Sequence, residues 1–136
     1  MPRTFEFADS EISRIDAQPG GLQICFAAAM LRVGDEATNL GCGNALQGYS
    51  NGVSLVLSGA TVQGDIAACT GRLNDGKLLH KGERLAALPL PSQWQAEGAP
   101  LRLDLQCANG AWLQVDAQQL RCEEAADARF VEVFKC

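Results

Sequence analysis

The fold class follows from one stretch of sequence, Leu101-Arg-Leu-Asp-Leu-Gln-Cys107, Ala108-Asn-Gly110 and Ala111-Trp-Leu-Gln-Val-Asp-Ala117. In both outer segments apolar residues alternate with polar ones, which is the period of a strand with one buried face. The middle segment holds an Asn-Gly pair, which is typical of a hairpin turn. The stretch therefore predicts two antiparallel strands whose leucines face a core.

The register of this hairpin follows from the pairing that keeps apolar side chains on one face. A two-residue turn at Asn109 and Gly110 would place Leu105 opposite Gln114 and mix the faces. A three-residue loop, with Gly110 in the left-handed region, avoids this mixing, because a slip of one residue exchanges the two faces of a strand. It pairs Leu105 with Leu113, Leu103 with Val115, Leu101 with Ala117, Arg102 with Asp116 and Gln106 with Trp112. We therefore predict the three-residue loop.

Other turn and strand signals recur along the chain. A second hairpin is expected with a two-residue turn at Asp75 and Gly76, which would pair Leu73 with Leu78. Gly59 is expected to bend one long strand over residues 53–63. Further strands are expected at residues 12–17, 83–88, 119–122 and 130–134.

Residues 22–33 allow two interpretations. Leu22, Phe26 and Met30 follow helical spacing, and Gly34 would cap such a helix at its C-terminus. Every second residue from Leu22 to Phe26 is also apolar, as in a strand. Because no capping residue precedes the helical pattern, we favour the strand.

These signals predict an all-β fold. We expect about eight short, mostly antiparallel strands in a compact sandwich or partly closed barrel, with at most one or two short helical turns. The chain has 136 residues, of which 47% are hydrophobic, and no linker-like region divides it. Residues 1–136 are therefore expected to form a single globular domain.

Charge and segment composition exclude several classes of protein. Acidic residues outnumber Lys and Arg by 16 to 11, so the net charge is −5 and a nucleic-acid partner is not expected. No run approaches the ~18 apolar residues of a membrane helix, and the first residues do not resemble a secretory signal. The sequence therefore predicts no membrane association and a cytoplasmic protein with reduced thiols.

The cysteines and the single histidine argue against a metal site or a cofactor. The six cysteines are far apart in the sequence, at positions 25, 42, 69, 107, 122 and 136. None has the short spacing of a zinc knuckle, and one histidine cannot form a multi-histidine site. Cys25 and Cys107 lie in apolar runs and are interpreted as small buried hydrophobes. We expect no metal and no cofactor.

Catalytic signals are weak, and we do not expect an enzyme. His80 would have to serve any histidine-based triad, but no G-x-S-x-G nucleophile elbow occurs in the sequence. The alternative for His80 is an exposed side chain beside Lys81. The acidic pairs 35–36 and 123–124 point to opposite faces of a strand, so they are interpreted as surface charge.

The glycine-rich segment 39–52 is the most distinctive part of the chain. It lacks the Gly-Lys-Ser/Thr of a phosphate loop, so we interpret it as a connection between strands. Asn44, Tyr49 and Asn51 are candidates for hydrogen bonds to a ligand or a partner. The alternative is that the asparagine amides cap local turns.

Trp112 is the fourth candidate binding residue. The hairpin register places it on the polar face of its strand, where a tryptophan needs a cover or a partner. The segment 91–100, which contains Trp94, is one possible cover, and a protein interface is the other.

The sequence therefore favours a small cytoplasmic all-β binding or interaction module whose partner is a protein, with self-association as a homodimer included. The alternative is a small-ligand-binding β-barrel with the loop 39–52 at its mouth. A hydrolase that depends on His80 or a cysteine comes last.

Overall fold

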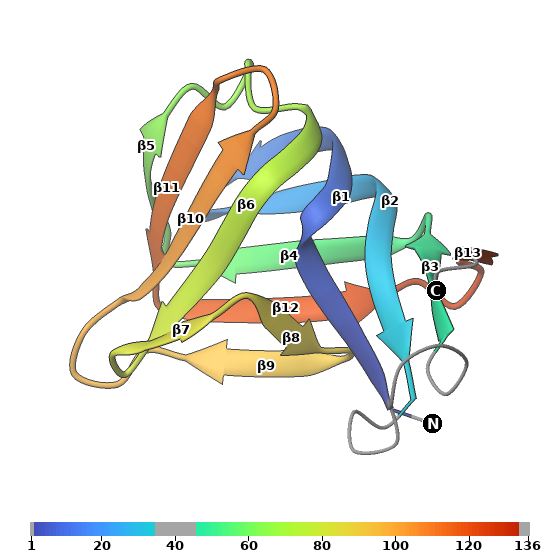
Figure 1. The fold of residues 1–136 in the computed structure, drawn as a ribbon. Helices are drawn as coiled ribbons and strands as arrows, with labels where there is room; N and C mark the ends of the chain where they lie inside the picture. The colour runs from blue at the N-terminus through green and yellow to red at the C-terminus, as the bar shows by residue number, and fades with distance from the viewer. Residues whose placement is uncertain (1, 35–45, 134–136) are drawn as a thin grey trace.

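The computed structural model describes residues 2–34 and 46–133, and all regular elements in these ranges are β-strands (Figure 1). The strands are β1 (Arg3–Gln18), β2 (Gly21–Val33), β3 (Leu46–Ser50), β4 (Val53–Ser58), β5 (Thr61–Gly64), β6 (Gly71–His80), β7 (Glu83–Leu85), β8 (Ala87–Pro89), β9 (Ser92–Gln95), β10 (Leu101–Cys107), β11 (Trp112–Ala117), β12 (Gln119–Glu124) and β13 (Phe130–Val133). The all-β class is confirmed, and residues 22–33 form a strand.

The described ranges contain thirteen strands where the sequence predicted about eight. Part of the difference comes from expected strands that are divided: residues 83–88 contribute to the two three-residue strands β7 and β8, and residues 53–63 to β4 and β5. It also comes from β3, which occupies the end of the segment that was expected to be a connection. None of the described residues belongs to a helix of the length and apolar character that a bilayer span requires.

The strands form one antiparallel sheet that is not closed. Its path is β5-β11-β10-β6-β1-β2-β4-β12-β9, which leaves β5 and β9 at the two edges. The path has two halves, β5-β11-β10-β6 and β1-β2-β4-β12-β9. They join where Glu11 and Ile12 of β1 pair with β6. In Figure 1 the strands β4, β12 and β9 run across the lower part of the view, and β6, β10 and β11 rise steeply beside them. The sheet is thus strongly curled, and its inner faces share one core.

A bulge in β1 allows this strand to pair with β2 in one half of the sheet and with β6 in the other. Asp9 has a φ of 69°, and the register to β2 shifts between Glu6 and Glu11. The buried Ser10 hydroxyl donates to the Glu6 carbonyl at 2.6 Å and accepts from the Met30 amide at 2.8 Å. Ser10 therefore satisfies backbone groups that the bulge removes from the ladder.

The hairpin at residues 101–117 has the predicted register throughout. Leu105 pairs with Leu113, Leu103 with Val115, Leu101 with Ala117, Arg102 with Asp116 and Gln106 with Trp112. Gly110 has a φ of +91° in the three-residue loop, as expected. The three leucines of β10 are buried, with at most 1% of each exposed.

The second predicted hairpin is wrong. Residues 71–80 form one continuous strand, β6, in which Asp75 pairs with Gln106 and Gly76 with Leu105 of β10. Gly76 is buried, and an added Cβ would lie 2.7 Å from the Phe7 Cβ. The glycine therefore makes room for Phe7 on the inner face and does not form a turn. The chain reverses later, at Lys81 and Gly82, which have φ values of 53° and 79°.

Gly59 bends the chain as expected, with a φ of +61°. The segments on its two sides are separate strands and not one long strand. β4 pairs with β2 and β12, whereas β5 pairs with β11 at the other end of the sheet path. The bend thus carries the chain from one half of the sheet to the edge of the other.

The core is one cluster of side chains from both halves. Phe5 stands edge-on to Phe7, with their ring centroids 5.0 Å apart, and it also contacts Phe26. These rings pack with leucines from β4, β6 and β10. A close-packed core of this kind supports the outer face of β5, β11, β10 and β6. We call this outer face the platform.

Candidate functional site

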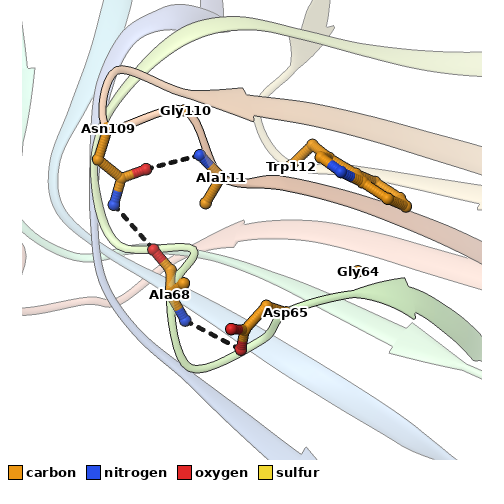
Figure 2. Close-up of a pocket in the computed structure, with 7 residues that line it drawn as sticks. All are labelled: Gly64, Asp65, Ala68, Asn109, Gly110, Ala111 and Trp112. Atoms are coloured by element: carbon orange, nitrogen blue, oxygen red, sulfur yellow. Dashed lines mark hydrogen bonds between the residues drawn. The ribbon is translucent and has the colours of Figure 1, made fainter.

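A surface hollow lies at the end of the platform where β5 leaves the sheet (Figure 2). Its volume is about 520 Å³, and it opens to solvent. The lining residues come from two connections and the strands beside them: Gly64, Asp65, Ala68, Asn109, Gly110, Ala111 and Trp112. One wall is the turn after β5, and the other is the β10–β11 loop with the first residue of β11.

The first wall is fixed by a carboxylate. Asp65 Oδ1 accepts from the backbone amides of Ala67 and Ala68, at 3.0 and 3.3 Å. This is the local pattern by which an aspartate closes a turn. Gly64, directly before it, has a φ of +110°, and an added Cβ would lie 2.4 Å from the Trp112 carbonyl oxygen. Glycine is therefore required where the two walls meet.

The second wall is fixed by Asn109. Its Oδ1 accepts from the Ala111 amide at 2.9 Å, which shapes the loop. Its Nδ2 donates to the Ala68 carbonyl at 2.9 Å, which ties the loop to the other wall (Figure 2). The two walls thus keep a fixed distance although 41 residues separate these partners in the sequence.

Asn109→Asp tests the tie between the walls. Aspartate keeps an oxygen acceptor for Ala111 but has no donor for the Ala68 carbonyl. We expect a loss of about 1 kcal/mol in the free energy of unfolding, the usual net contribution of one hydrogen bond. Urea denaturation measures it, and hydrogen exchange should accelerate at both walls. Unchanged stability and unchanged exchange would show that the tie is not formed.

Trp112 is exposed. About 52% of its surface is accessible, and it forms one side of the hollow (Figure 2). The cover that the sequence suggested is elsewhere, because Trp94 lies on β9 at the opposite edge of the sheet path. The Trp94 ring stands edge-on to His80, with centroids 5.2 Å apart, and its Nε1 donates to Ser92 Oγ at 3.0 Å. Of the two interpretations of Trp112, internal cover by Trp94 is therefore wrong.

The outer face beside Trp112 is polar and carries charges of both signs, with one more carboxylate than cations when Asp65 of the hollow is included. The strand registers place Trp112 next to Gln106, and Gln106 next to Asp75 of β6. The following row holds Gln114, Asp104 and Lys77. Carboxylates on this face and at the hollow come from Asp65, Asp75, Asp104 and Asp116, whereas the cations of the same strands are Arg72, Lys77 and Arg102.

One cation on this face is already paired. Arg102 Nε donates to Asp116 Oδ1 at 3.0 Å, and this hydrogen bond is the main cause that raises the pKa of Arg102. Asp104 accepts from Gln114 Nε2 at 3.1 Å, lies opposite Lys77, and also helps to raise the pKa of Arg102. In the described residues the Asp75 and Asp65 carboxylates accept from backbone amides and form no ion pair, so the negative charge nearest Trp112 comes from these two groups.

The described part of the glycine-rich segment, residues 46–52, does not line the hollow. Tyr49 lies on β3, where it pairs with Met30 and Val131 and is half-buried. The Asn51 amide oxygen accepts from the Arg129 backbone amide at 2.7 Å. This partner lies 78 positions away in the sequence, so the side chain joins two distant segments and does not cap a local turn, which was the alternative interpretation. Asn44 lies outside the described residues. The structure therefore does not bring Tyr49 or Asn51 to Trp112.

His80 is not arranged as a catalytic histidine in the described part of the chain. Its Nε2 is 3.8 Å from Glu97 Oε2, and its ring contacts Trp94. Glu97 also forms an ion pair with Lys81. In residues 2–34 and 46–133 no hydrogen bond joins the His80 ring to a serine or cysteine. Within the same residues, no group of three or more His, Cys, Asp or Glu side chains could hold a metal ion.

No family model, curated protein or solved structure matches this chain. We therefore infer the function of the chain from the hollow and its platform. Sequence reasoning identified Trp112 and its face but missed Asp65, Ala68 and Asn109 as wall residues. The Asp and Asn turn signals were available, but the contact between two distant turns leaves no local pattern.

Proposed function

We propose that the chain is a small binding module that holds a basic segment of a protein partner in the Trp112 hollow. The observation that carries this proposal is the 52% exposure of Trp112 beside a hollow of about 520 Å³. A tryptophan at a protein surface is a frequent anchor of protein interfaces, because it gives large contact area at low entropic cost.

The charge of the platform favours a basic partner. The carboxylates of Asp65 and Asp75, which form no ion pair in the described residues, lie at the hollow and in the row of Trp112. An arginine or lysine of the partner that lies over the indole face would gain a cation–π contact and face these carboxylates. A second copy of this acidic chain would bring like charges together. The homodimer stays a prediction from the sequence. The cytoplasmic location also stays a prediction from the sequence.

An extended protein segment fits the position of the hollow better than a small molecule does. In the described residues β5 pairs with β11 alone, so its other edge presents unpaired backbone groups beside the hollow. The hollow also opens outward, and Leu113 and Val115 fill the inner face below it. No observation favours the ligand-binding barrel, which stays a prediction, as does the absence of catalysis.

Selection from a random peptide display library tests this function. Peptides are selected on the wild-type chain and counter-selected on Trp112→Ala. We expect enrichment of Arg and Lys, and a loss of affinity of at least tenfold in Trp112→Ala, which corresponds to ~1.4 kcal/mol. Trp94→Phe is the matched control and should bind as the wild type does. Peptides that bind both proteins equally, or that are enriched in acidic residues, would contradict the proposal.

A further inference from the structure

Two cysteines meet directly behind the hollow. Cys69 directly follows the wall residue Ala68, and Cys107, the last residue of β10, lies two positions before the wall residue Asn109. Their Sγ atoms are 2.9 Å apart, although 38 residues separate the cysteines in the sequence. Both side chains are buried, with 0% and 2% exposed. Because a disulfide bond is about 2.0 Å long, the two sulfur atoms need to approach by only ~1 Å to form one.

We infer that Cys69 and Cys107 form a disulfide that joins the two walls of the hollow. The oxidant we assign is a low-molecular-weight disulfide. A cysteine thiolate attacks one of its sulfur atoms, the bond between its two sulfurs breaks, and one small thiolate leaves. The second cysteine then attacks the protein sulfur of the mixed disulfide and displaces the second small thiol. The protein thiols lose two electrons and two protons, and the external disulfide gains both electrons.

Burial decides when this exchange takes place. Removal from water, followed by the hydrogen bond to Cys107, raises the pKa of the Cys69 thiol to about 12. Because the thiolate is the nucleophile, a folded chain near neutral pH exchanges slowly until the turn opens. The bond is therefore made while the walls come together during folding, or when they open. Once made, it is shielded from external thiols.

The remaining described cysteines differ from this pair. Cys122 is also buried, and burial raises its pKa to about 12, but no other described cysteine contacts it. Cys25 is half-buried, and no hydrogen bond joins its thiol to another cysteine of the described residues. These two provide controls, because they match the pair in residue type but have no sulfur partner among residues 2–34 and 46–133.

Fragment mapping tests the disulfide. Cleavage before aspartate places each of the six cysteines in its own fragment, with Cys69 in 65–74 and Cys107 in 104–115. The full chain is refolded from denaturant with oxidised glutathione, alkylated, cleaved and analysed by mass spectrometry. We expect the linked pair 65–74 and 104–115 as the main product. Glutathione adducts alone, or links that involve other cysteines, would overturn the inference.

Thermal stability gives a second readout. Closing a loop of this length should raise the melting temperature by about 10 °C over the reduced chain. The rise should persist in Cys25→Ala and disappear in Cys107→Ala. A rise of the same size in Cys107→Ala would contradict the assignment. The result is separable from the proposed function, because Trp112→Ala should keep the disulfide whether or not peptides bind.

Discussion

Gly76→Val is expected to lower the free energy of unfolding by about 3 kcal/mol, at the upper end of the usual cost of overpacking a core. Valine places its Cβ where it would lie 2.7 Å from the Phe7 Cβ and 3.0 Å from a methyl group of Leu105. Both neighbours are fully or almost fully buried and cannot move into solvent. Strand β6 would have to shift away from β1 at the join between the halves. For a chain of this length the melting temperature should fall by about 10 °C.

Two further variants make this expectation specific. Lys77→Val places the same side chain on the outer face of β6, where the stability should change by less than about 0.5 kcal/mol. Gly76→Asn would be tolerated in a two-residue hairpin turn, because asparagine adopts the left-handed region. In the buried strand it should cost at least as much as valine, because its amide enters an apolar environment. If Gly76→Asn were as stable as the wild type, the result would support a hairpin turn at Asp75 and Gly76 and would contradict the continuous strand β6.

Glu124→Ala is expected to cost about 2 kcal/mol, because one carboxylate connects three strands. Glu124 on β12 forms an ion pair with Arg3 of β1 and accepts from the buried Ser50 hydroxyl of β3 at 2.6 Å. The Arg3 guanidinium also lies over the Phe130 ring, 5.5 Å from its centroid. Alanine leaves a guanidinium that is only 32% exposed, and a fully buried hydroxyl, without their shared partner.

Chemical denaturation of Glu124→Ala and Glu123→Ala separates this network from a general effect of charge. Both variants remove one negative charge from neighbouring positions of β12, but Glu123 has no ion pair among the described residues. We expect Glu123→Ala to remain within about 0.5 kcal/mol of the wild type. Equal losses in the two variants would mean that the ion pair and hydrogen bond at Glu124 contribute nothing.

The sequence predicted elements whose signals are local. The hairpin at residues 101–117 was predicted in full register, because alternation in both strands leaves a single pairing that keeps the leucines together. Gly76 shows where such reasoning fails. Asp-Gly is a strong local signal for a turn, but the small residue is needed for Phe7, about seventy positions away in the sequence. A contact at this distance overrides the local preference and has no sequence signature.

The same limit applies to the hollow. The alternation of residues 112–117 placed Trp112 on the polar face, but neither interpretation of Asn51 included its hydrogen bond to Arg129, which lies 78 positions away. The opposite wall was not predicted, because Ala68 and Asn109 meet only when β5 pairs with β11 at the sheet edge. The pairing of Cys69 with Cys107 escaped notice for the same reason, since Cys107 was interpreted as a small buried hydrophobe and Cys69 was given no role.

Mapping of backbone amide shifts by NMR tests the binding site most directly. The isotope-labelled chain is titrated with a basic peptide obtained from the display selection. We predict that the largest changes in chemical shift fall on the amides of Gly64, Asp65 and residues 109–112. Acidic peptides of equal length should leave these amide shifts unchanged. Changes concentrated instead at Tyr49 and Asn51, or along β9, would place binding elsewhere and contradict the assignment of the hollow.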